Sequence, residues 1–207
     1  MPIMLNFINR SYDPRNAKIV IFQKNEAAGL DEPPVAWRVI EHRDVSHNHP
    51  FRFPMSMAVG TSDSWGNHTP QIPAQNGAMY HVELTSSGDT LSYCGPATSN
   101  REVQVRNDLA KGAINAGIYK EGRLLAIKTN IAPGQKAAFE FRPNIWIGAA
   151  PQVTEGDLLD PAILSEINTE LSLVAVASAD IVMTGGGPGP GTGTEPFTFH
   201  LENIQMD

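Results

Sequence analysis

Period-two alternation of apolar and polar side chains is the feature that most limits the folds open to this chain of 207 residues. Val103 and Val105 alternate with polar neighbours, and Phe197, Phe199 and Leu201 repeat the pattern near the C-terminus. Successive side chains of a strand point to opposite faces, so each run predicts a strand with one buried face. The continuous apolar run Ile19–Phe22 predicts a strand that is buried on both faces.

Turn residues separate about a dozen such strand candidates, a spacing typical of all-β folds. Gly88-Asp89 and Glu121-Gly122 each divide two alternating runs and predict hairpins. Asp160-Pro161 is the main helix signal, an N-cap followed by a first-turn proline. We therefore predict an all-β antiparallel sandwich with Greek-key connections, forming a single domain over residues 1–207.

A weak similarity links two parts of the chain. Ile21-Phe22 resembles Ile118-Tyr119 at an offset of 97, and Phe51-Arg52-Phe53 resembles Phe139-Glu140-Phe141 at an offset of 88. The two matches occur in the same order, as expected for two related halves. Short strands also resemble one another by chance, so both interpretations remain open at this point.

Composition bears on partners and location. The net charge of −7, without a cluster of Lys or Arg, disfavours a nucleic-acid partner. The longest apolar run is far short of a bilayer span, and the N-terminus has no signal-peptide pattern. We expect a chain that is cytoplasmic as synthesised, with non-classical export left open. Charged residues are only 18% of the chain, a proportion found in self-associating proteins and compatible with a membrane-active β protein.

No catalytic motif stands out. The lone cysteine, Cys94, precludes an intrachain disulfide and sits at the end of a strand-like run, where we expect a half-buried thiol. The Gly/Pro-rich segment 185–196 contains neither a phosphate-binding register nor a following helix, so it predicts a loop. These observations favour a non-enzymatic protein without a cofactor.

Histidines are concentrated between residues 42 and 81. His47 and His49 are two positions apart, so an extended segment would point both to one face. With His68 or another ligand they would suit a divalent transition metal. The alternative is that these histidines lie in surface loops, because their spacing matches no ligand motif.

Trp65 lies in a polar segment between Asp63 and Asn67. An exposed indole there would stack on a sugar or a partner protein, with Asp63 and Asn67 supplying hydrogen bonds. The competing interpretation is a tryptophan that folds back over the core. Trp37 and Trp146 lie in strand-like runs, which predict core positions for both.

The leading hypothesis is a non-enzymatic binding or self-associating β-sandwich protein, with carbohydrate or protein as its partner. A metal-binding protein that uses the histidines is the first alternative. A membrane-active β protein is the second.

Overall fold

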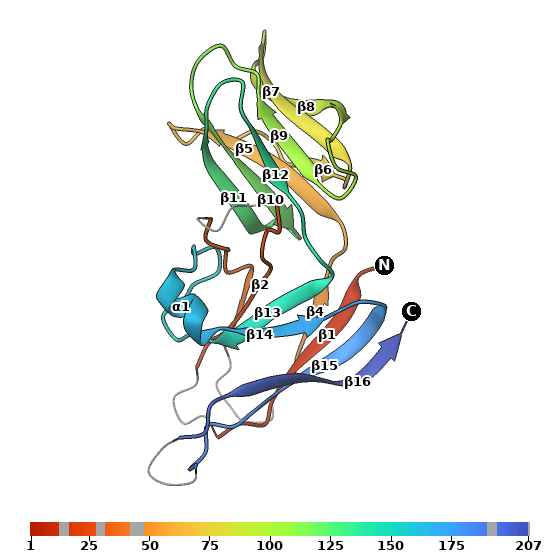
Figure 1. Cartoon of the computed structure of the whole chain (residues 1–207), viewed down its shortest axis with the longest axis vertical. Coiled ribbons are helices and arrows are strands. Elements are labelled where there is room, and N and C mark those ends of the chain that lie inside the picture. The colour runs from red at the N-terminus through yellow and green to blue at the C-terminus, as the bar shows by residue number, and fades with distance from the viewer. Residues whose placement is uncertain (13–16, 28–31, 42–47, 190–193, 207) are drawn as a thin grey trace. The chain divides into compact units, whose positions relative to one another are not determined.

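The computed structural model describes residues 1–12, 17–27, 32–41, 48–189 and 194–206. These residues form sixteen strands and one short helix (Figure 1). The predicted all-β class is therefore confirmed. The helix, α1 (Pro161–Glu166), begins where the sequence predicted, because the side chain of Asp160 accepts a hydrogen bond from the amide of Ile163 at 2.9 Å.

The chain divides into two compact units. Unit 1 comprises Met1–Phe22, Ala36–Met55 and Pro143–Asp207, and unit 2 comprises Gln23–Val35 and Ser56–Arg142. Unit 1 is thus assembled from both ends of the chain. The expected single domain over residues 1–207 stays a prediction.

Unit 1 consists of two four-stranded sheets with the orders β16-β15-β1-β4 and β14-β13-β2-β3. The strands of the first sheet are β1 (Ile3–Asn9), β4 (Asn48–Phe53), β15 (Val176–Thr184) and β16 (Thr198–Met206). Those of the second are β2 (Ile19–Phe22), β3 (Arg38–Ile40), β13 (Asn144–Ala149) and β14 (Thr169–Ser172).

Strand β2 is buried on both faces, as its continuous apolar run predicted. One face carries Val20 and Phe22, which pack with Val153, Leu159 and Ile167 from the segment that contains α1. This segment therefore covers one face of the second sheet. Burial on both sides explains why β2 lacks the alternation of the other strands.

Trp37 and Trp146 also belong to unit 1. The ring of Trp37 is fully buried and meets Phe53 edge-on, with ring centroids 5.5 Å apart. The ring of Trp146, on β13, is half-buried and stacks on Phe22 at 6.4 Å. The predicted core position is confirmed for Trp37, whereas Trp146 is partly buried and packs against the core from its edge.

Unit 2 also consists of two four-stranded sheets, with the orders β11-β10-β5-β6 and β12-β9-β7-β8. The strands of the first sheet are β5 (Met57–Asp63), β6 (Ile72–Ala74), β10 (Ile114–Lys120) and β11 (Arg123–Ile131). Those of the second are β7 (Ala78–Thr85), β8 (Gly88–Pro96), β9 (Val103–Asn107) and β12 (Lys136–Phe139).

Both predicted hairpins are present in unit 2. Glu121 and Gly122 join β10 to β11 with φ angles of 51° and 74°, the left-handed pair that a tight two-residue hairpin turn requires. The other hairpin joins β7 to β8, and its turn precedes Gly88 instead of following it.

Two strand pairings differ from the expected antiparallel sandwich. Strand β1 runs parallel to β15, and β7 runs parallel to β9. Alternation of side chains gives the face that a strand buries but not the direction of its neighbour, so the sequence carried no signal for these parallel pairs.

The C-terminal run forms β16, an edge strand of unit 1. Phe199 faces inward with 8% of its surface exposed, whereas Phe197 and Leu201 are only half-buried. The Gly/Pro-rich segment 185–196 connects β15 to β16, so in its described part it is the predicted hairpin loop; residues 190–193 lie outside the description.

Candidate functional site

The turn after β5 is organised by one carboxylate. Asp63 Oδ1 accepts hydrogen bonds from the amides of Trp65 and Asn67 at 2.8 and 2.9 Å. Asp63 Oδ2 accepts a third bond from Asn67 Nδ2 at 2.7 Å, and the Asp63 amide donates to the Asn67 carbonyl at 3.0 Å. Four hydrogen bonds therefore close a loop of five residues.

These contacts hold the Asp63 carboxylate in its charged form. The hydrogen bond from the Asn67 side chain, together with those from backbone amides, places the pKa of Asp63 below its ordinary value. A carboxylate that already accepts three hydrogen bonds is a poor proton acceptor at neutral pH. Its role here is to shape the turn and to place negative charge beside it.

The indole of Trp65 stands at the tip of this turn. Its side chain is 88% exposed, so it does not cover the core. Of the two interpretations left open by the sequence, the structure agrees with the exposed one. The same carboxylate that accepts from the Trp65 amide therefore fixes the backbone from which the indole projects.

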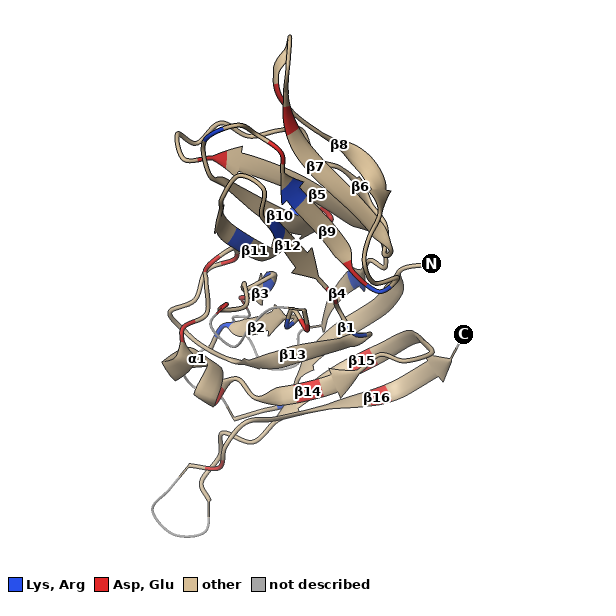
Figure 2. Ribbon diagram, turned by 45° about the horizontal axis from the view of Figure 1, so that its top comes forward, with Lys and Arg blue, Asp and Glu red and all other residues tan. Residues whose placement is uncertain are grey.

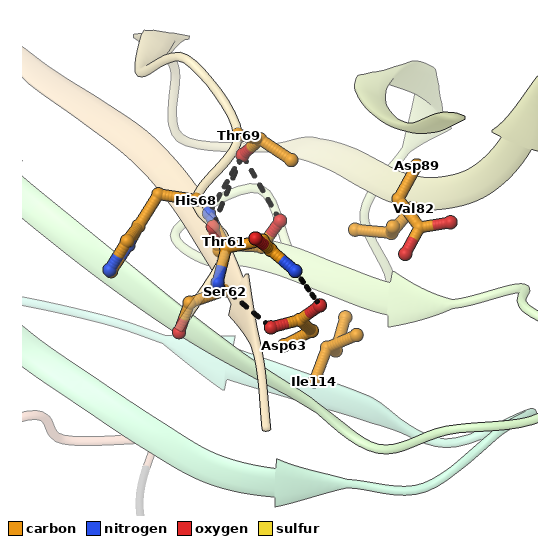
Figure 3. Close-up of a pocket in the computed structure, with 9 residues that line it drawn as sticks. Thr61, Ser62, Asp63, His68, Thr69, Val82, Asp89 and Ile114 are labelled. Atoms are coloured by element: carbon orange, nitrogen blue, oxygen red, sulfur yellow. Dashed lines mark hydrogen bonds between the residues drawn. The ribbon is translucent and has the colours of Figure 1, made fainter. Parts of the chain in front are cut away.

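A pocket of about 250 Å³ lies beside this turn, within unit 2 (Figure 3). Buried side chains Val82, from β7, and Ile114, from β10, contribute apolar surface to it. The remaining lining is polar and comes from β5, from the segment after it and from the start of β8: Thr61, Ser62, Asp63, Asn67, His68, Thr69 and Asp89.

One wall of the pocket is fixed by paired threonines. The Thr61 amide donates to Thr69 Oγ1 at 3.0 Å, and the Thr69 amide donates to the Thr61 carbonyl at 2.9 Å. Their hydroxyl oxygens are 3.1 Å apart, and Ser62 forms a β-bridge with His68. The polar groups therefore stand on backbone that is tied to β5, an arrangement suited to binding without reorganisation.

The chemistry of this pocket favours binding. Hydroxyl, amide, imidazole and carboxylate groups surround a small apolar surface, the usual composition of a site for a polar organic ligand. Asp63 and Asp89 also give the pocket negative charge. Such a site is better suited to a neutral or cationic ligand than to an anion.

The predicted histidine site is only partly described. His42 and His47 lie outside the described residues, His49 belongs to β4 of unit 1, and His68 lines the pocket of unit 2. Among the described residues, no three His, Cys, Asp or Glu side chains are grouped to hold a metal ion. The metal hypothesis remains a prediction without structural support.

Cys94 is half-buried on β8, as predicted, and its Sγ donates to the Met79 carbonyl at 3.4 Å. Burial raises the pKa of the thiol, so it is mostly protonated at neutral pH. On the neighbouring β7, His81 Nδ1 lies 2.7 Å from Asp108 Oδ2, which Arg106 also contacts at 2.7 Å. Asp108 is thus engaged in a surface network.

Charged residues in unit 2 are paired in several places. Arg106 Nε contacts Asp108 at 2.6 Å, and Arg101 contacts Glu140 at 3.2 Å. Figure 2 shows basic and acidic residues interspersed along the strands and turns. In the part of the chain that the structure describes, no helix is long and apolar enough to cross a membrane.

Sequence reasoning found one side of the site and missed the other. Asp63, Trp65 and Asn67 are neighbours in the sequence, and the composition of their segment identified them. Val82, Asp89 and Ile114 come from three other strands; the sequence predicted a turn at Asp89 and gave no functional signal at Val82 or Ile114. Only the folded pairing of β5 with β10 brings Ile114 opposite Asp63.

Comparison of the chain with known protein families, with curated proteins and with solved structures gave no match. The functional assignment therefore rests on the chemistry of the site.

Proposed function

We propose that the chain is a non-enzymatic binding protein and that the pocket of unit 2 takes a hydroxyl-rich ligand, such as the terminal ring of a saccharide. One observation carries this proposal. A pocket with a small apolar surface and rigid polar walls lies beside a turn that presents a nearly fully exposed tryptophan.

The two parts of the site would contribute in different ways. A sugar ring has apolar C–H faces and a rim of hydroxyl groups. The indole of Trp65 offers a flat apolar surface with little conformational entropy to lose. The threonine hydroxyls and the Asp89 carboxylate offer acceptors for the hydroxyl rim, which would set the orientation of the ligand.

The size of the pocket favours a small ligand over a protein partner. Pockets that enclose drug-sized molecules have volumes of about 300–1,000 Å³. The present volume of about 250 Å³ is just below that range and fits one ring better than a folded surface. A protein partner would instead need to bury about 800 Å² of this chain's surface.

A panel of soluble neutral and amino oligosaccharides, followed by intrinsic fluorescence and titration calorimetry, tests the proposal. We expect at least one member to change the tryptophan emission and to bind. Trp65→Ala should weaken that binding by tenfold or more while leaving the thermal midpoint unchanged. Asp89→Asn should weaken it independently, because Asp89 lies on the pocket wall.

Tyr93→Ala serves as the matched control. Tyr93 is another exposed aromatic residue of unit 2, 62% exposed, but it does not line the pocket. Its replacement should leave saccharide affinity unchanged. If no member of the panel binds, or if Tyr93→Ala weakens binding as much as Trp65→Ala, the pocket is not the proposed site.

A further inference from the structure

The two units have the same strand plan. The order β4-β1-β15-β16 in unit 1 matches β12-β9-β7-β8 in unit 2, and β14-β13-β2-β3 matches β6-β5-β10-β11. The directions also agree, because the only parallel pairs among the named strands are β1 with β15 and β9 with β7. Strands β1–β8 therefore correspond, one by one and in chain order, to β9–β16.

The correspondence extends to the register of individual residues. In unit 1, Phe22 lies opposite Trp146, whereas in unit 2 Tyr119 lies opposite Ala58. Adding 97 to the number of a β2 residue gives the equivalent residue of β10, and adding 88 to the number of a β5 residue gives the equivalent residue of β13. With these two offsets, all four residue pairs of the β2–β13 ladder match pairs of the β10–β5 ladder. These are the two offsets at which short sequence similarities occur.

Two buried asparagines occupy matching positions at the ends of β1 and β9. Asn9 lies opposite Met183 in one parallel ladder, and Asn107 lies opposite Val82 in the other. Both side chains are at most 1% exposed. Each asparagine Oδ1 accepts the amide two residues further on, from Ser11 at 2.9 Å and from Leu109 at 3.0 Å.

A strand can end without this asparagine turn. Its presence after both β1 and β9 is therefore a similarity between the two halves that is independent of strand order and register. Matching order, direction, register and turn chemistry together indicate that the two halves of the chain share one fold plan. Chance similarity between short strands would not reproduce the register of non-local pairs.

The matching halves, however, do not each form one unit. Strands β1–β4 of the first half are in unit 1 with β13–β16 of the second half. Strands β5–β8 of the first half are in unit 2 with β9–β12 of the second. Each half thus contributes four strands to unit 1 and four strands to unit 2.

We infer that residues 1–100 and 101–207 are two copies of one eight-stranded repeat and that each copy is the binding partner of the other. The contact between copies consists of whole sheet ladders with buried side chains, such as fully buried Phe7 opposite Ile181. Side-chain hydrogen bonds add to it, as from Asn6 Nδ2 to Asp180 Oδ1 at 2.9 Å.

In this arrangement the two copies exchange strands, because each unit contains four strands from each copy. Cleavage of the chain between the copies tests this strand exchange. A protease recognition sequence inserted after Asn100, an exposed residue between β8 and β9, allows the folded full-length chain to be cleaved into its two copies. We expect the cleaved protein to elute at the size of the intact chain in native buffer and to separate only in denaturant. Separation of the two fragments in native buffer would overturn the inference.

A circular permutant tests the equivalence of the copies. Ser178 pairs with both Met4 and Gln205, so β1 and β16 flank β15, as Figure 1 shows. Two strand spacings place Met4 and Gln205 about 10 Å apart. Met79 pairs with Gln104 and Gly95 in the same way, and six residues, 97–102, join those strands. Joining residue 207 to residue 1 through three added residues gives a link of the same length.

The permutant that begins at Arg101 and ends at Asn100 should fold to a monomer with a thermal midpoint close to that of the natural order. In the control permutant, with the same link, the chain is opened after Ser86 in the β7–β8 turn, inside a repeat, and we expect a lower midpoint. A permutant opened at Asn100 that is less stable than this control would contradict the equivalence of the copies.

Discussion

Gly148→Ala is the substitution whose effect the structure of unit 1 constrains most tightly. A Cβ atom at Gly148 would lie 2.6 Å from Ile167 Cγ2 and 2.8 Å from Ile167 Cα. Ordinary carbon contacts are about 3.5–4.0 Å, so Ile167 would have to retreat by about 1 Å. Ile167 is 1% exposed and its backbone is part of the obstruction, which leaves little room for relaxation.

Two effects of opposite sign determine how much Gly148→Ala changes the free energy of unfolding. Overpacking of a buried site costs about 1–3 kcal/mol, and the involvement of backbone favours the upper part of that range. Replacing glycine by alanine also restricts the unfolded chain, which stabilises by about 0.4–1 kcal/mol. We expect Gly148→Ala to lower the free energy of unfolding by about 1–2 kcal/mol.

Gly60→Ala is the matched control, because Gly60 occupies the corresponding position of unit 2 in the strand equivalence. Its Cβ would approach no atom closer than 3.3 Å, and the nearest are side-chain atoms of Gln71 and Tyr119. Urea denaturation followed by circular dichroism should show a near-neutral effect for Gly60→Ala. A Gly148→Ala variant as stable as the unmodified protein would refute the packing of residues 150–168 against β13.

Two further predictions concern stability. Phe199→Ala should lower the free energy of unfolding by about 3–5 kcal/mol, because the ring is 8% exposed and lies opposite fully buried Met183; half-buried Phe197→Ala should cost less in the same denaturation assay. Burial lowers the pKa of Lys120 from 10.5 to about 7 in the folded chain. Between pH 7 and 10.5 the unfolded chain therefore binds more protons at this residue than the folded chain does, so the free energy of unfolding rises with pH. Urea midpoints measured from pH 7 to 8.5 should therefore rise more in the unmodified protein than in Lys120→Met, and an equal pH dependence in both would count against the burial of the charge.

Local sequence patterns predicted much of the secondary structure. Alternation located β9 and β16, the Asp160-Pro161 pair located α1, and Glu121-Gly122 located a hairpin. These features depend on residues within a few positions of one another, which a sequence displays directly.

Pairing between distant strands was not predictable in the same way. β1 and β15 are separated by most of the chain, and neither strand carries a local mark of its partner. The two sequence offsets of 97 and 88 left a repeat and a chance similarity both open, and they carried no sign of strand exchange between the halves. The register of the ladders was needed to show which strands correspond.

The candidate site divides along the same line. The turn from Asp63 to Asn67 was recognisable because its polar residues and tryptophan are contiguous. Asp89 and Ile114 reach the pocket only through tertiary pairing, so their local sequence gave no sign of it. Proximity in sequence also suggested a histidine cluster, but His49 and His68 belong to different units and His47 lies outside the described residues, so the metal hypothesis stays a prediction.

Nuclear Overhauser contacts between backbone protons of parallel strands test the exchanged arrangement most directly. The exchanged arrangement predicts contacts between Phe7 and Ile181 and between Tyr80 and Val105. If each half instead folded on its own, the equivalence of the strands would place Phe7 beside Tyr80 and Val105 beside Ile181. Observation of that second set in place of the first would contradict the exchange.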